Sequence, residues 1–89
     1  MIYWSDDGVS LSPTIFRYKD YRFFFFSREE TRQHVHVISP EGEAKFWLEP
    51  IVSLADKTSL NARQLKELHA VIERKKDEIR RAWNKHFKG

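Results

Sequence analysis

The fold is decided by the stretch HVHVISPEGEAKFWLE, residues 34–49. Each half alternates apolar and polar side chains, and its apolar positions are Val35, Val37, Ala44, Phe46 and Leu48. Because successive strand residues point to opposite faces, each half presents one apolar face. Pro40, Glu41 and Gly42 between the halves favour a turn. The stretch therefore predicts a β-hairpin with one face directed at a core.

Placing both apolar sets on one face also sets the register of this hairpin. His36 then lies opposite Lys45, and His34 lies opposite Trp47. The polar face would hold two imidazoles, an ammonium group and an indole. The alternative is a three-residue turn with a bulge at Gly42, which would shift the pairing by one residue and mix the two faces.

Two further strands are predicted before the hairpin. Residues 14–18 and 21–26 are rich in aromatic and β-branched side chains, and Lys19 and Asp20 form the turn between them. The four consecutive phenylalanines at 23–26 have no polar face. We therefore expect a central strand that is covered on both sides.

A long amphipathic helix is predicted over residues 62–87. Its apolar positions, at spacings of three, four and seven, are Leu65, Leu68, Ile72, Ile79, Ala82, Trp83 and Phe87. A straight helix of this length would span about 39 Å at 1.5 Å per residue. The apolar stripe lapses at 74–77, where we expect a break. Residues 51–54 form either a short extra strand or the lead into this helix.

Length and composition predict one small domain. Of the 89 residues, 13–89 form a single α+β domain and the turn-rich residues 1–12 are expected to form a flexible leader. The absence of cysteine excludes disulfides and thiolate metal sites and suits the cytoplasm. The longest apolar run, 23–26, is far shorter than the roughly 20 residues of a membrane helix. The expected fold is an antiparallel meander of about four short strands followed by the helix.

The positive charge is concentrated in the last third of the chain. Residues 1–59 hold seven Lys and Arg against nine Asp and Glu, a net charge of −2, whereas residues 60–89 hold nine against four, a net of +5. The helix cations singled out as contacts for a partner are Arg74, Lys75, Lys76, Arg80, Arg81 and Lys85. They either solvate the helix or contact the phosphates of a nucleic acid or an acidic protein.

The candidate catalytic residues are His34, His36, Lys45 and Arg22. Imidazoles move protons near neutral pH, and cations hold a phosphate, so this set suits metal-independent cleavage of RNA. A His-x-His pair also offers two metal ligands, but a catalytic zinc site needs a third. We therefore expect no metal and no cofactor. The alternative is that both rings are packing groups on a half-buried face covered by Trp47.

Five segments of the chain resemble the bacterial family called domain of unknown function 4160. In order, they are residues 13–18, 21–27, 34–37, 42–50 and 82–84. The resemblance implies a small cytoplasmic protein, encoded beside another short protein, of a kind suspected to be the toxin of a toxin–antitoxin module. The family motif covers Arg22, His34, His36, Lys45 and Trp47.

The chain departs from the family pattern directly before strand 34–38. The family commonly has His-Glu-Pro-Pro there, whereas Glu30, Thr31, Arg32 and Gln33 stand in this sequence, so a third imidazole is missing. We expect a toxin-like protein that binds a small antitoxin partner and binds or cleaves RNA, with Trp47 and the helix cations as contacts. The competing interpretation is a non-enzymatic module for protein interaction or nucleic-acid binding.

Overall fold

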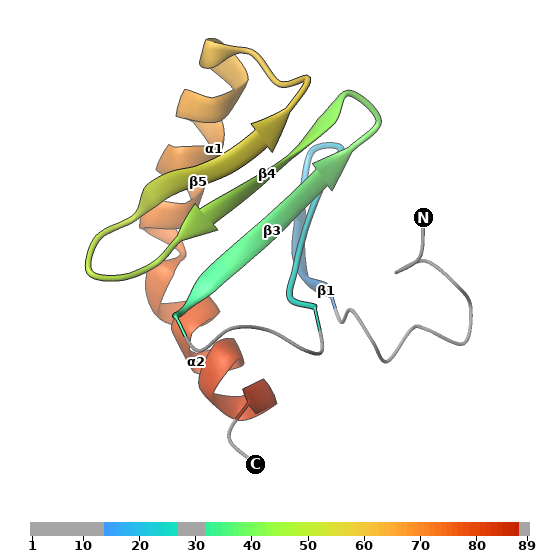
Figure 1. The fold of residues 1–89 in the computed structure, drawn as a ribbon. Coiled ribbons are helices and arrows are strands. Elements are labelled where there is room, and N and C mark those ends of the chain that lie inside the picture. Colours follow the sequence, from blue (N-terminus) through green and yellow to red (C-terminus); the bar gives the residue numbers. More distant parts are fainter. Residues whose placement is uncertain (1–13, 27–31, 88–89) are drawn as a thin grey trace.

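The protein is described by a computed structural model that covers residues 14–26 and 32–87. The leader predicted for residues 1–12 lies outside the described residues. One sheet contains the strands β1 (Thr14–Tyr18), β2 (Tyr21–Phe24), β3 (His34–Ser39), β4 (Gly42–Trp47) and β5 (Ser53–Thr58). All neighbouring strands are antiparallel and their order follows the chain (Figure 1). Two helices follow, α1 (Ala62–Arg74) and α2 (Lys76–Phe87).

This architecture confirms the predicted α+β meander, with one difference in the strand count. The fifth strand is β5, which begins at Ser53 and continues four residues beyond the segment 51–54 that we considered as an extra strand. All six of its residues are exposed or half-buried, because β5 is an edge strand that pairs only with β4.

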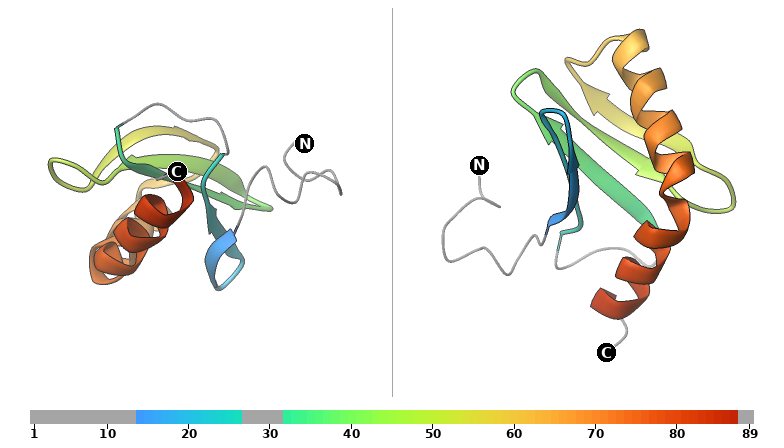
Figure 2. Two further views of the ribbon diagram at one scale, coloured as in Figure 1. Left: turned by 90° about the horizontal axis from the view of Figure 1, so that it is seen from below. Right: turned by 180° about the vertical axis from the view of Figure 1, so that it is seen from behind.

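Both helices cover the same face of the sheet (Figure 2). The sheet contributes Phe23, Phe25, Val35, Val37, Phe46 and Leu48 to the core, and the helices contribute Leu68, Ile72, Ile79 and Trp83. We call the face under the helices the inner face and the opposite one the outer face. Because the helices cover only the inner face, only the strand side chains that point to that face pack against the apolar side chains of the helices.

The hairpin of β3 and β4 has the register that its apolar pattern predicts. Val35 pairs with Phe46 and Val37 with Ala44, all on the inner face. Ser39 pairs with Gly42, so the loop contains only Pro40 and Glu41. The alternative pairing, shifted by one residue through a bulge at Gly42, does not occur. As predicted, His36 lies opposite Lys45 and His34 opposite Trp47.

The central position predicted for the phenylalanine run is also confirmed. β2 lies between β1 and β3, and all four of its side chains are buried. The strand ends at Phe24, two residues earlier than the expected 26. Phe25 belongs to the inner-face core, whereas Phe24 and Phe26 contact the His36 ring on the other side.

The helical part of the chain begins with a cap at Asn61 and breaks at Lys75, within the segment where a break was predicted. The side chain of Asn61 accepts a hydrogen bond from the Gln64 amide at the start of α1, and the Gln64 side chain accepts one from the Asn61 amide. This reciprocal cap satisfies two amides that lack partners within the helix. α1 ends at Arg74 and α2 begins at Lys76, inside the segment 74–77 where the apolar stripe lapses.

We predict that Gly42→Ala destabilises the protein. A Cβ at Gly42 would lie 2.3 Å from the Thr58 carbonyl oxygen, so the pairing of β4 with β5 would have to shift. Overpacking of this kind costs about 1–3 kcal/mol of unfolding free energy. Urea denaturation would measure the loss, with Asp20→Ala in the exposed β1–β2 turn as the control. Equal stability of the two variants would contradict the close packing of this turn.

Candidate functional site

No helix of the described residues covers the outer face of the sheet (Figure 2). Cross-strand pairing arranges its side chains in rows. One row runs Thr14, Phe24, His36, Lys45 and Asp56, and the next runs Arg17, Arg22, Ile38, Glu43 and Thr58. Charged, aromatic and imidazole side chains from all five strands therefore share one surface.

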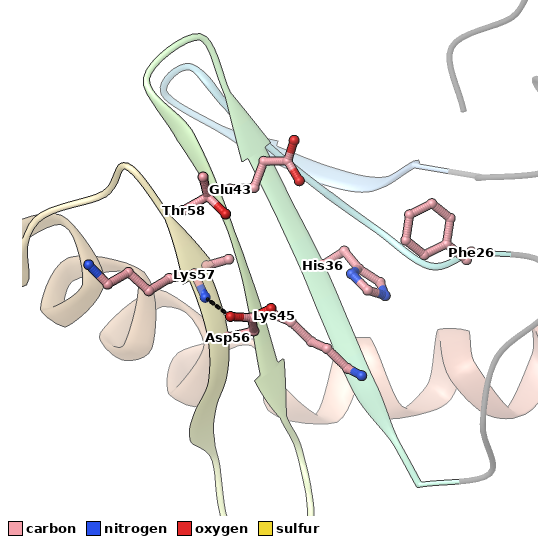
Figure 3. Close-up of a pocket in the computed structure, with 8 residues that line it drawn as sticks. Phe26, His36, Glu43, Lys45, Asp56, Lys57 and Thr58 are labelled. Carbon is pink, nitrogen blue, oxygen red and sulfur yellow. Dashed lines mark hydrogen bonds between the residues drawn. The ribbon is translucent and has the colours of Figure 1, made fainter. Parts of the chain in front are cut away.

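A pocket of about 210 Å³ lies in the middle of this face. Its lining includes Phe26, His36, Glu43, Lys45, Asp56, Lys57 and Thr58. Figure 3 shows the side chains of His36 and Lys45 projecting from β3 and β4 on the same side of the sheet. Lys57 points away from His36 in this view, and its ammonium group donates to the Leu60 carbonyl oxygen at 3.3 Å. We call this the His36 pocket.

Aromatic neighbours hold the His36 ring in place. Its centre lies 4.4 Å from that of Phe26 in an edge-on contact, and 5.5 Å from that of Phe24 in a stacked contact. The His34 ring contacts it edge-on at 5.0 Å. His36 is nevertheless only half-buried. The ring is therefore oriented by packing while part of it stays open to the pocket.

His34 has no solvent-exposed surface. Besides His36, its ring contacts Trp47 at 5.6 Å and Trp83 of α2 at 5.1 Å. Nδ1 lies 2.7 Å from the Arg32 carbonyl oxygen and must donate to it, because a carbonyl oxygen only accepts. A catalytic base has to reach its substrate. The His34 ring therefore packs against His36 and has no surface open to a substrate, which is what the alternative of packing groups expects of it.

Arg22 lies one row away from the pocket. Its Nε donates to the Thr14 hydroxyl at 2.6 Å, and its guanidinium carbon lies 4.7 Å from the centre of the Phe24 ring. Arg22 lines a second hollow of about 780 Å³ together with Arg17, and the two hollows share Glu43 and Thr58. The structure thus brings His36 and Lys45 together and places Arg22 at a neighbouring position.

Two cations lie over the rings of Trp47, which is two residues after Lys45 on β4. The Arg32 guanidinium carbon is 4.0 Å, and the Lys45 ammonium nitrogen 4.5 Å, from the centre of its rings. Such cation–π contacts stabilise both partners and orient the indole. Trp47 is half-buried, so an edge or face of the ring remains accessible. From the sequence, Arg32 was named only as one of the four residues that depart from the family pattern, and no role was predicted for it.

Two carboxylates of the pocket were also missed from the sequence. Asp56 lies directly opposite Lys45 in the pairing of β4 with β5, and Glu43 precedes Lys45 by two residues on the same face. The alternation of β4 would have placed Glu43 beside Lys45. Asp56 could not be placed, because the extent and register of β5 were unknown.

The helices that carry the basic residues lie on the inner face of the sheet (Figure 2), whereas the His36 pocket is on the outer face. Lys75 pairs with Glu78 at 3.6 Å and Lys76 with Glu73 at 3.9 Å. Arg80 donates to the Leu48 carbonyl oxygen at 2.9 Å, which ties α2 to the end of β4. The remaining predicted contacts, Arg74, Arg81 and Lys85, are exposed. The helix cations and the pocket therefore belong to two different surfaces.

Within residues 14–26 and 32–87, no three His, Asp or Glu side chains are grouped so that they could hold a metal ion. None of the helices described is long and apolar enough to cross a membrane.

Fold and site together define a small α+β protein in which no described helix covers the outer face of the sheet, and in which an imidazole and an ammonium group line one pocket on that face. Residues 20–84 match the family model described as Domain of unknown function (DUF4160). The match spans well over half of the chain, so the protein belongs to this family, as the resemblance predicted. No curated protein and no solved structure matches the chain.

We predict that the two histidines differ sharply in their contribution to stability. His34→Ala would leave a cavity between Trp47 and Trp83 and should cost about 2–5 kcal/mol, the range of large-to-small core substitutions. His36→Ala removes a half-buried ring and should cost less than half as much. Urea denaturation of both variants checks this difference. If the two variants lost equal stability, the packing role of His34 would be wrong.

Proposed function

We propose that this protein is the toxin-like component of a bacterial toxin–antitoxin module, and that it binds and cleaves RNA at the His36 pocket without a metal ion. One observation supports the proposal most directly. His36 and Lys45 are directly opposed on neighbouring strands and line one pocket on the open face of the sheet. The family resemblance adds the association with toxins and with a small partner protein.

RNA contains its own nucleophile for this reaction. The 2′-oxygen of a ribose attacks the adjacent phosphorus while its proton passes to the His36 ring, and the bond from phosphorus to the 5′-oxygen breaks. The leaving oxygen takes a proton from water, and the proton held by His36 returns to solvent. The products are a cyclic phosphate and a 5′-hydroxyl. Lys45 stabilises the negative charge that builds on the phosphate.

The burial of His34 restricts this chemistry to one imidazole. A mechanism with two accessible histidines, one as base and one as acid, does not fit a ring with no exposed surface. His34 supports the reaction indirectly, because its edge-on contact at 5.0 Å limits the orientations of His36. Asp56, opposite Lys45, favours the position of the ammonium group on this side of the sheet.

Trp47 supports the binding of a single strand. Base stacking on an aromatic ring tolerates any sequence, because every base has a flat face. The half-buried indole of Trp47 lies beside Lys45, and Arg32 adds a second cation at 4.0 Å. A base on Trp47 would place the neighbouring phosphate near the His36 pocket.

A second candidate function is binding without cleavage. The mixed charge of the pocket favours it, because Glu43 and Asp56 line the same space as Lys45 and oppose a phosphate. In that case the outer face would recognise RNA or a protein, and His36 would only shape the surface.

We predict that His36→Gln and Lys45→Gln each lower the rate of RNA cleavage at saturating RNA. The loss should be about 10²–10⁴-fold for His36 and about 10²–10³-fold for Lys45, the ranges for a positioned base and for one charge-stabilising group. Labelled single-stranded RNA in a buffer with EDTA, resolved on denaturing gels, gives the rates. Growth after expression without the neighbouring protein gives the effect in cells.

Lys66→Gln, on the exposed side of α1, is the matched control and should behave like the wild type. RNA binding and growth arrest without cleavage would favour the second candidate function. A wild-type protein that neither binds RNA nor slows growth would overturn both. Loss of cleavage only in EDTA would show that a metal ion takes part.

We also predict that Trp47→Ala weakens the binding of single-stranded RNA by about 1–3 kcal/mol, the cost of losing one stacked base. The cleavage rate at saturation should change much less, because Trp47 binds rather than reacts. Fluorescence anisotropy at one fixed salt concentration measures the affinity. Ile51→Ala, at an exposed apolar position, is the control. Unchanged affinity of Trp47→Ala would exclude stacking at this site.

A further inference from the structure

An apolar groove of about 360 Å³ lies between β1 and α2. It is lined by Thr14, Ile15, Phe25, Ala82, Lys85 and His86, and we call it the β1–α2 groove. Figure 2 shows α2 on the inner face of the sheet, and Phe25 of the groove belongs to the inner-face core. The groove is therefore a different surface from the His36 pocket, and the proposed reaction does not use it.

Contacts with the helices hold β1 beyond the residues that line the groove. The Lys75 ammonium nitrogen lies 5.2 Å from the centre of the Phe16 ring. Just beyond β1, Lys19 donates to a Glu67 carboxylate oxygen at 2.6 Å, as does the Tyr18 hydroxyl. These bonds lower the pKa of the Glu67 carboxyl. They fix the end of β1 against α1, whereas the start of β1 and the last turns of α2 border the groove.

The floor of the groove is preformed. Phe25 has 1% of its surface exposed, and its ring contacts Trp83 edge-on at 5.2 Å and Phe87 at 5.8 Å. Ile15 and Ala82 form half-buried walls. Large apolar side chains could enter without moving the core, and their burial would supply the main favourable term for binding.

The rim of the groove is positively charged. Residues 79–87 of α2 contain Arg80, Arg81 and Lys85 but no Asp or Glu. Lys85 lines the groove and is exposed, as is Arg81 one turn earlier. The acidic residue closest along the helix, Glu78, pairs with Lys75. In the part of the chain that the structure describes, no ion pair involves Arg81 or Lys85, and an apolar groove beside such positive charge attracts a negatively charged occupant that has large apolar side chains.

We propose that the β1–α2 groove binds an acidic, amphipathic segment of the partner protein. Apolar side chains of that segment fill the space over Phe25, and its carboxylates face Lys85 and Arg81. RNA fits less well, because Ile15 and Ala82 offer no flat ring for a base. This inference rests on the proposed function, since it states where the antitoxin-like partner binds and what chemistry its binding segment has.

The test uses the full chain and one probe, the short protein encoded by the neighbouring gene. Ala82→Glu and Lys85→Glu should each weaken its binding about tenfold or more in calorimetry, because a carboxylate in the groove opposes both apolar and acidic groups. The matched controls are Ala70→Glu and Lys66→Glu, at exposed positions of α1, and should stay within about twofold of the wild type. Circular dichroism confirms that all four variants fold.

Methyl NMR locates the contact independently of the variants. The signals of Ile15 and Ala82 should shift when the neighbouring protein is added, and those of Ile51 and Leu54 at the β5 end of the sheet should not. The inference is overturned if the neighbouring protein does not bind, if both groove variants bind it like the wild type, or if only RNA shifts the Ile15 and Ala82 signals.

RNA cleavage separates this inference from the proposed function. Ala82→Glu and Lys85→Glu should cleave RNA like the wild type when the partner is absent, because neither residue lines the His36 pocket. Partner binding that depends on the groove, in a protein that does not act on RNA, would support the groove and overturn the proposed function. If the protein cleaves RNA but the neighbouring protein does not bind in the groove, the proposed function would stand and this inference would be overturned.

Discussion

The pairing of β3 with β4 is the constraint on which the rest of the structure depends. Val35 against Phe46 and Val37 against Ala44 place four apolar side chains on the face that the helices cover. Because strand side chains alternate, the same pairs force His36 and Lys45 together on the opposite face. A shift by one residue would bury the polar set and expose the apolar one. The register of this hairpin therefore determines both which side chains form the core and which side chains line the pocket.

α2, which follows the break at Lys75, contacts residues that support the His36 pocket. α2 runs past the start of β3 (Figure 1), where Trp83 contacts the His34 ring at 5.1 Å, and His34 in turn contacts His36 at 5.0 Å. Trp83 of the inner-face core therefore supports His36 on the outer face through the His34 ring, at the start of β3. A preorganised ring loses less freedom when a substrate binds, and this favours an oriented base over a mobile one.

The sequence predicted those features of the fold that depend on residues close together in the chain. The hairpin register follows from alternation within residues 34–49, and the helix break follows from the lapse of the apolar stripe at 74–77. β5 was only partly foreseen, because an exposed edge strand such as Ser53–Thr58 has little apolar periodicity. Packing of His34 against Trp47 was one of the alternatives that the sequence offered, but its contact with Trp83 could not be predicted, because Trp83 is far away in the sequence. Arg80 looked like a surface cation, but the Leu48 carbonyl that it binds also comes from a distant segment.

The two proposed binding surfaces meet at three consecutive phenylalanines. Phe25 forms the floor of the β1–α2 groove, whereas Phe24 and Phe26 pack against His36 on the other side of the sheet. A partner in the groove would therefore lie behind the pocket without covering it, and RNA and partner could bind at the same time. A segment bound there would contact Phe25 and not the pocket itself. Its proposed route to the pocket is the position of the segment 24–26, whose outward rings contact His36.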